Sequence, residues 1–305
     1  MRPVRTARDR SVSAARSHGE PRVPAEVLVL GGIASVQFGS AFADTLFGEA
    51  GPGGVVFLRV ALAAAVLLPI ARPSLRGRRR VDLGAAVAFG LVLAGMNWSF
   101  YEALDRLPLG VAVTIEFIGP LVVAVAGSRR PLDGVWVALA AGGVALLAVR
   151  GGHTGVHLAG VLLALVAATC WALYILLSQR VGRAFAQLDG LAIAFAVGTL
   201  LVTPVGILQG GSALLRPHVL AGGLGVALLS SLIPYSLELI ALRRLSAYRF
   251  GVLMSLEPAV AALAGVLVLG QSLTTVLAVA LVMVIAASLG NTITARRLPA
   301  PQPEA

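Results

Sequence analysis

The sequence contains no lysine and a single cysteine, and only 12% of its 305 residues are charged. A soluble domain usually carries about 25% charged residues, so this chain has too little polar surface for water. Because Cys170 is alone, no intramolecular disulfide and no cysteine-based metal site can form. We expect its thiol to pack as a small apolar group.

Several catalytic motifs are missing as well. No GxxxxGK[ST] string is present, so we expect no ATP site, and no serine stands in a nucleophile-elbow context. His153 and His157 are four residues apart, but Gly152 and Gly155 make that stretch a link rather than a metal-binding helix. These absences predict that the chain is not an enzyme and uses no metal and no cofactor.

Hydrophobic residues, by contrast, make up 58% of the chain, and the mean hydropathy is +0.90. A membrane-spanning helix needs about 20 mostly apolar residues. Short links rich in Pro, Gly, Arg or Asp separate ten such segments, which predicts an all-α polytopic membrane protein. The predicted transmembrane helices are 26–47, 53–71, 82–104, 109–127, 133–149, 157–178, 189–208, 218–241, 248–268 and 274–293.

The arginines alternate between the two sides of these helices. Twenty of the 24 fall in the two tails and in alternate links, and Arg59, Arg106, Arg150 and Arg216 fall near the opposite face. By the positive-inside rule both termini are cytoplasmic. Residues 1–25 are predicted to be a disordered basic tail and 294–305 a second cytoplasmic tail. Topology thus explains the basic composition, and we expect no nucleic-acid partner.

The two halves of the chain repeat. At a constant offset of 138 residues, Ala103–Leu107 matches Ala241–Leu245, and Pro120 matches Pro258. The halves, 26–150 and 157–293, would each hold five helices. Because five is odd, the second half enters the membrane from the opposite side. Such inverted repeats are typical of secondary transporters, whose substrate sites lie near the midplane. Chance similarity between two apolar, alanine-rich halves is the alternative.

Ionisable groups deep in a bilayer cost about 2.5 kcal/mol or more, so they are functional candidates. Glu257 lies about ten residues into its predicted helix, before Pro258, which leaves the Met254 carbonyl without its usual donor. Glu116 lies one turn before Pro120. We predict both for proton coupling and substrate binding; a purely structural carboxylate is the alternative.

Other polar and aromatic residues in the spans complete a predicted site for a small amphipathic ligand. Glu238 could bind substrate or pair with Arg243 or Arg244, and Glu102 could pair with Arg106 or Arg59. Packing or interfacial anchoring is the alternative for the aromatic members. The remaining predicted substrate-binding residues are Gln37, Ser40, Asn97, Tyr101, Trp171, Tyr174 and Tyr235. On the first helix, Gly31, Ser35 and Gly39 form a small-residue face for close packing.

Several strings resemble the drug/metabolite transporter superfamily, specifically its EamA-type inner-membrane threonine/homoserine exporter family. The resemblance runs from about residue 27 to 297. Its most specific strings are Gly95-Met96-Asn97, Pro108-Leu109-Gly110, Glu116-Phe117-Ile118-Gly119-Pro120-Leu121, Ser128-Arg129-Arg130-Pro131, Cys170-Trp171-Ala172-Leu173-Tyr174, Pro234-Tyr235-Ser236-Leu237-Glu238 and Leu253-Met254-Ser255-Leu256-Glu257-Pro258-Ala259.

The resemblance implies a bacterial inner-membrane protein that exports threonine, homoserine or related metabolites by proton-coupled alternating access. The expected partners are a small amino acid or metabolite, protons and membrane lipid, with a homodimer as an open option. The chain departs at Gln271, where such transporters commonly have Glu, and this puts in doubt a proton or gating role there. A broad drug/metabolite exporter is the alternative function, and a channel or membrane-embedded enzyme is a remote one.

Overall fold

The computed structural model describes residues 23–126, 131–150, 157–185, 188–242, 244–245 and 247–295, and every regular element in these ranges is helical. Up to residue 150 the elements are α1 (Ala25–Asp44), α2 (Phe47–Ala71), α3 (Arg80–Leu104), α4 (Leu109–Glu116), α5 (Ile118–Ala126) and α6 (Pro131–Arg150). They continue as α7 (Leu158–Ala184), α8 (Asp189–Gly210), η3 (Gly211–Leu215), α9 (Pro217–Ala227), η4 (Leu228–Leu232), α10 (Ile233–Leu242), α11 (Ala247–Met254), α12 (Glu257–Leu269) and α13 (Thr275–Ala295). Most of the predicted tails, residues 1–22 and 296–305, lie outside the described residues.

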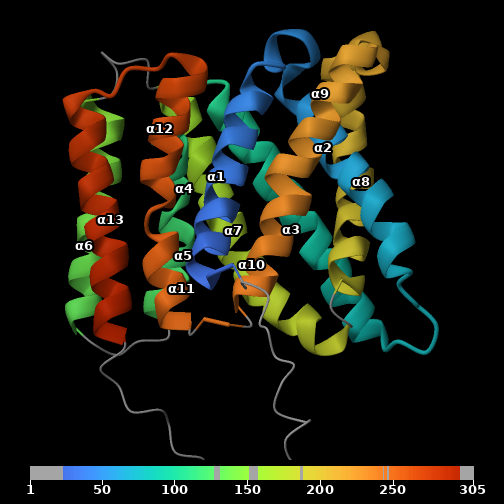
Figure 1. The fold of residues 1–305 in the computed structure, drawn as a ribbon, viewed down its shortest axis with the longest axis horizontal. Coiled ribbons are helices and arrows are strands. Elements are labelled where there is room, and N and C mark those ends of the chain that lie inside the picture. Colours follow the sequence, from blue (N-terminus) through green and yellow to red (C-terminus); the bar gives the residue numbers. More distant parts are fainter. Residues whose placement is uncertain are drawn as a thin grey trace, which may run out of the picture.

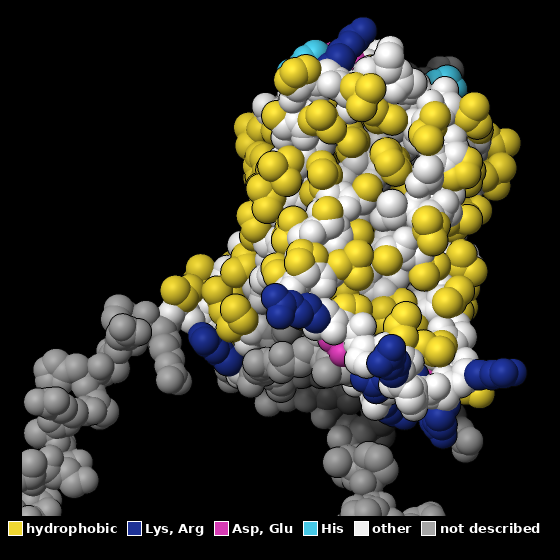
Figure 2. All heavy atoms as spheres, turned by 90° about the vertical axis from the view of Figure 1, so that its right-hand side faces the viewer, with side chains coloured by type: hydrophobic (Ala, Val, Ile, Leu, Met, Phe, Trp, Pro, Cys, Tyr) yellow, Lys and Arg dark blue, Asp and Glu magenta, His cyan; other side chains and the backbone are white. Residues whose placement is uncertain are grey.

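Most of the helices have the length and the apolar composition of membrane-spanning helices. In the described part of the chain, eight helical stretches are long and apolar enough to cross a membrane, and Leu109–Val123 and Gly134–Leu147 are shorter apolar stretches. Figure 2 shows hydrophobic side chains over the middle of the visible face and arginines gathered at its lower end. The chain is therefore a multi-pass membrane protein. Its ten-helix count stays a prediction.

The helices pack side by side in one bundle (Figure 1). α6 and α13 pair at one edge, and α2, α8 and α9 lie at the other. α1 lies in the middle, where it contacts α10 and α12. The links after α2, α7 and α10 lie at the lower end in Figure 1, and those after α1, α8 and α12 lie at the upper end. Segments far apart in sequence therefore surround the centre of the bundle.

Two helices predicted to be continuous are interrupted. The predicted helix 109–127 breaks at Phe117, and 248–268 breaks at Ser255 and Leu256. In each case a proline follows within three residues of the break: Pro120 and Pro258 lack the N–H that would continue the backbone ladder. The prediction of continuous helices was wrong here because a hydropathy pattern does not register the missing donor.

A third predicted helix, 218–241, contains the π-helical turn η4. Pro234 follows it and cannot donate to the carbonyls of Ser230 or Leu229, its α-type and π-type partners. Side chains donate to both instead: Ser35 Oγ to Leu229 O at 2.7 Å and Arg59 Nη2 to Ser230 O at 2.7 Å. Two other helices, α1 and α2, are thereby tied to this turn.

The predicted link between helices 26–47 and 53–71 is also different in the structure. α2 begins at Phe47 and runs through this stretch, with a bend at Gly51, whose φ is 65°. Only glycine adopts this left-handed conformation without strain. Pro52 follows directly, so the helix restarts with a proline in its first turn, where its missing N–H costs nothing.

The small-residue face of α1 packs on η4, as the spacing of Gly31, Ser35 and Gly39 predicts. A Cβ on Gly39 would lie 2.8 Å from Leu229 Cβ and 3.1 Å from the Leu229 carbonyl carbon. We expect Gly39→Ala to lower the free energy of unfolding by about 1–3 kcal/mol, the usual cost of overpacking. Thermal unfolding of the purified protein in detergent would measure this.

Gly84→Ala in α3 is the matched control, because a Cβ there meets nothing within 4 Å. Alanine is the better helix former, so this variant is expected to unfold at the wild-type temperature or slightly above it. Equal melting temperatures for the two variants would contradict the close approach of α1 to η4.

Candidate functional site

A cavity of about 460 Å³ lies in the centre of the bundle, among helices from both halves of the chain. Residues of α1, α2, α3, α4, α5, α7, η4, α10, α11 and α13 line it. Eight of the ten predicted substrate-binding residues are among them: Gln37, Ser40, Asn97, Glu116, Trp171, Tyr174, Tyr235 and Glu238.

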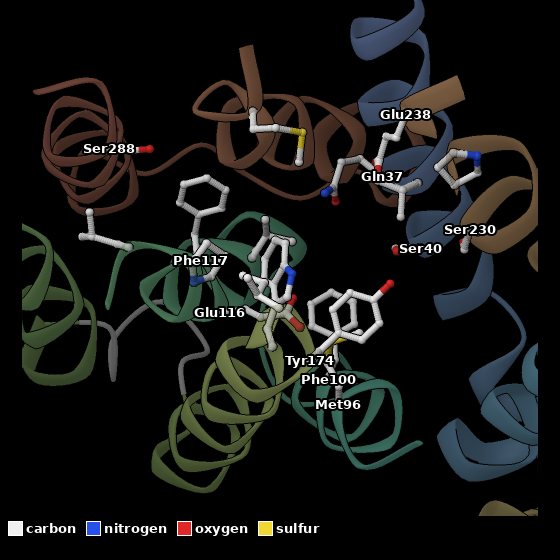
Figure 3. A pocket seen from close by; sticks show the side chains of 18 of the residues that line it. Gln37, Ser40, Met96, Phe100, Glu116, Phe117, Tyr174, Ser230, Glu238 and Ser288 are labelled. Atoms are coloured by element: carbon white, nitrogen blue, oxygen red, sulfur yellow. The ribbon is translucent and has the colours of Figure 1, made fainter. Parts of the chain in front are cut away.

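Acidic and polar groups converge on this cavity (Figure 3). Glu116 is the last residue of α4, beside the break at Phe117, and its side chain is only 9% exposed. Glu238 reaches the cavity from α10, and Ser40 and Gln37 reach it from α1. Asn97 on α3 donates from Nδ2 to the carbonyl of Leu93 at 2.7 Å.

Glu257 does not line the cavity; it lies behind Gln37. Gln37 Nε2 donates to Glu257 Oε1 at 3.1 Å, and both residues are buried. Glu257 is the first residue of α12, at the helix end where the macrodipole favours a negative charge. Among the described residues, Glu257 Oε2 and Gln37 Oε1 are buried without a hydrogen-bond partner. These two side-chain oxygens are therefore available to accept hydrogen bonds next to the cavity.

Tyr101 likewise stands back from the cavity wall, where it supports Arg59. It is fully buried, and its hydroxyl accepts a hydrogen bond from Arg59 Nη1 at 3.2 Å. Its ring packs against Phe47 and Phe100, with centroids 5.5 Å and 6.0 Å away. Of the ten predicted residues, Tyr101 and Glu257 are thus neighbours of the lining rather than part of it.

Arg59 is the main residue that sequence reasoning misplaced. The prediction put it near a membrane face, with Glu102 as a possible partner. It lies twelve residues into α2, is only 5% exposed and lines the cavity. The available signal was its position as the one ionisable residue within the apolar run Val55–Ala71. Cationic side chains inside membranes are rare enough to be functional candidates.

Other lining residues went unnoticed because single serines and asparagines are common. Ser230 is 2% exposed, and its Oγ has no hydrogen-bond partner among the described residues. Ser288 and Asn291 on α13 also reach the cavity. Ser288 Oγ is 2.7 Å from Ser255 Oγ at the α11–α12 break. These hydroxyl and amide groups add hydrogen-bonding capacity to the acidic set.

Aromatic rings form the rest of the wall. Trp171 and Tyr174 lie three residues apart on α7, and Phe117 meets Trp171 edge-on at 5.8 Å. Tyr174 stacks on Phe89 at 4.9 Å, and Tyr235 meets Phe195 edge-on at 6.3 Å. These contacts hold the rings as rigid surfaces. The cavity therefore combines apolar walls with a few charged and hydrogen-bonding groups, as small-molecule sites do.

Comparison with known proteins shows that the chain is similar to transporters along most of its length. Residues 158–293 match the model of the EamA-like transporter family. The threonine/homoserine exporter RhtA of Escherichia coli (strain K12) is 44% identical over 273 residues, which cover 89% of this chain and 92% of that protein. The chain belongs to the EamA-like transporter family.

Two further comparisons agree with this membership. The threonine/homoserine exporter RhtA of Salmonella typhimurium (strain SL1344) is 43% identical over 279 residues, covering 91% of this chain and 94% of that protein. A solved crystal structure with 21% identity superposes with a TM-score of 0.60 and covers 90% of this chain and 100% of its own. At that identity the structural match shows a shared fold alone.

Gln271, the departure from the EamA-type pattern, has a clear contact. Its Oε1 accepts a hydrogen bond from the backbone N–H of Leu109 at 3.0 Å. Leu109 opens α4, so the amide satisfies one of the free donors at that helix start. A neutral amide thus links the α12–α13 link to α4, and a glutamate could accept the same bond.

Glu102, the remaining predicted acidic residue, stays outside the cavity. It pairs with Arg106 at 2.8 Å, one of its two predicted partners, and accepts from Gln209 Nε2 at 2.9 Å. Gln209 Oε1 in turn accepts from the backbone N–H of Gly53 at 2.6 Å. This group joins α2, α3 and α8 at the upper end of the bundle in Figure 1.

Proposed function

We propose that this chain exports small amino acids such as threonine and homoserine from the bacterial cytoplasm, and that the central cavity is its substrate site. The observation that carries the proposal is the convergence of Glu116, Glu238 and Gln37 on one cavity, in a chain whose relatives are named threonine/homoserine exporters. An amino-acid zwitterion needs hydrogen-bond donors for its carboxylate and an acceptor for its ammonium group.

We further propose ten transmembrane spans in two inverted five-helix repeats, 26–150 and 157–293. The helix bounds support this: α4 spans 109–116 and α11 spans 247–254, which is the offset of 138 seen in the sequence. Both helices are followed by a break and a proline, Pro120 and Pro258. The arginines gathered at one end support an inner-membrane orientation with both termini in the cytoplasm.

The positions of the two helix breaks, between α4 and α5 and between α11 and α12, support an alternating-access mechanism. Phe117 at one break and Met254 beside the other both line the cavity, so each broken helix meets the site where its backbone ladder is interrupted. The half-helices on either side can change their angle without losing further backbone hydrogen bonds. Such movement would expose the cavity to one side of the membrane and then to the other.

Proton coupling divides between two carboxylates in this proposal. Glu116 lines the cavity and contacts the substrate, so it binds the ammonium group. Glu257 is shielded by Gln37 and has an unpartnered oxygen, so it carries the proton. A carboxyl group in a poorly solvated site can exchange its proton for a bound cation as access alternates.

The direct test is transport by purified protein in vesicles. We expect saturable movement of labelled threonine and homoserine. This movement should accelerate when a pH gradient drives protons across the membrane in the opposite direction. Movement without saturation would indicate a channel and contradict the proposal. A panel of amino acids, analogues and unrelated toxins would separate an amino-acid exporter from a broad-specificity one, which the aromatic wall of Phe117, Trp171 and Tyr174 would also suit.

A further inference from the structure

Arg59 is a buried cation held rigidly in the wall of the cavity. Its Nε donates to Ser231 Oγ at 3.1 Å, its Nη1 to Tyr101 Oη at 3.2 Å and its Nη2 to Ser230 O at 2.7 Å. The guanidinium carbon also lies 5.4 Å from the centre of the Tyr101 ring. These contacts come from two different elements, η4 and α3, so the guanidinium plane is fixed before any ligand arrives.

Two N–H groups of this guanidinium have no hydrogen-bond acceptor among the residues that the structure describes. A guanidinium has five N–H groups, and the three hydrogen bonds above use three of them. One N–H therefore remains on each terminal nitrogen. All three acceptors are neutral oxygens. Two N–H groups of one guanidinium are what a carboxylate needs for a bidentate contact.

The charge of Arg59 also lacks a close counter-charge. Among the described residues, no carboxylate oxygen lies within 4.0 Å of its nitrogens. A buried charge without a partner is costly, so such a site favours a ligand that brings the opposite charge. Because Arg59 lines the cavity, a ligand in the cavity can reach it.

Carboxylates on the same cavity are in the reverse situation. Glu116 and Glu238 line it, and neither has a cation within 4.0 Å among the described residues. Arg59 and Glu116 both line the cavity and form no ion pair with each other. The cavity thus presents separated charges of both signs, and a small zwitterion between them would neutralise both.

We propose that Arg59 is the anchor for the substrate's α-carboxylate and so restricts the cavity to ligands with a free carboxylate. This deepens the amino-acid transport proposed above and rests on it. The ammonium group would then face Glu116. Fixing the carboxylate end at a rigid group also orients the rest of the molecule, which is how one cavity can distinguish amino acids from amines of similar size.

The test compares threonine with threonine amide, which keeps the ammonium group and side chain but lacks the carboxylate. Binding to the purified protein in detergent is measured by titration calorimetry. Wild-type protein is expected to bind threonine about tenfold to a hundredfold more tightly than the amide, the range for a charge-assisted contact. Arg59→Gln should bind threonine as weakly as the wild type binds the amide, and its affinity for the cationic amide should not fall, because a like charge is removed from the cavity. Arg216→Gln, at an exposed outer site, is the control.

A merely structural Arg59 would give a different pattern, because loosening the cavity weakens both ligands equally. Tyr101→Phe and Ser231→Ala each remove one support of the guanidinium and keep its charge in place. We expect each to reduce the preference for threonine over the amide about threefold or more while the protein stays folded. An unchanged preference in these variants, or equal wild-type affinity for the two ligands, would overturn the proposal. If wild-type protein binds neither ligand, the proposed function itself fails.

Discussion

Glu257→Gln is expected to abolish proton-driven threonine transport while threonine–threonine exchange continues. Glutamine keeps the size of the side chain and an oxygen that can accept from Gln37, so the α1–α12 contact survives. It cannot release or bind a proton near neutral pH, so the transport cycle loses its link to the gradient. Because Glu257 does not line the cavity, substrate affinity should change by less than about threefold.

Two assays on the same vesicles separate these effects. Gradient-driven accumulation of labelled threonine reports coupling, and counterflow with unlabelled threonine on the far side reports substrate exchange alone. Glu49→Gln is the control, since Glu49 is an exposed carboxylate that pairs with Arg216 and His218 and does not line the cavity. Full gradient-driven accumulation by Glu257→Gln would show that the proton travels elsewhere, and Glu238 would be the next carboxylate to test.

Glu116→Gln is expected to weaken threonine binding about tenfold to a hundredfold and to slow counterflow as well as gradient-driven transport. The physical reason is loss of the negative charge that pairs with the ammonium group inside a poorly solvated cavity, where a charge-assisted hydrogen bond contributes about 1.5–3 kcal/mol. The change leaves side-chain volume nearly constant, so the buried position at the end of α4 tolerates it. Titration calorimetry with threonine measures the loss.

The matching ligand for this variant is a hydroxy acid that keeps the carboxylate of threonine and lacks its ammonium group. Its affinity should not fall in Glu116→Gln, because the ligand has no ammonium group to lose a partner and the variant removes a like charge from the cavity. Glu102→Gln, which changes a carboxylate outside the cavity, serves as control for general loss of charge. Loss of affinity for both ligands in parallel would contradict ammonium binding by Glu116 and would indicate damage to the cavity.

The two predictions give different roles to the carboxylates: Glu257 carries the proton and Glu116 binds the ammonium group. The difference comes from the side chain of Gln37. Gln37 stands between Glu257 and the cavity, while Glu116 itself lines the cavity. In sequence both residues looked alike: each is a glutamate within four residues of a proline in an apolar helix. Glu116 lines the cavity and Glu257 lies behind Gln37. This difference depends on α1, which carries Gln37 and comes from a distant part of the chain.

The amino-acid sequence by itself determined the membrane-protein class, the approximate position of most helices and many of the polar residues that line the cavity. These features follow from local composition, because a bilayer imposes length and apolarity on each segment separately. Eight of ten predicted site residues line one cavity for a related reason: polar groups in apolar spans are costly, so they gather where they can be satisfied.

Only the tertiary structure decided the rest. It put Arg59 at the cavity with Ser230, Ser231 and Tyr101 around it, although one lies 42 and the others about 170 residues away in sequence. It also showed that side chains of α1 and α2 donate to the carbonyls of Leu229 and Ser230, to neither of which Pro234 can donate. Hydropathy is read from each helix separately. These contacts arise from helix packing, because side chains distant in sequence must bind the polar groups and charges that have no partner within their own helix.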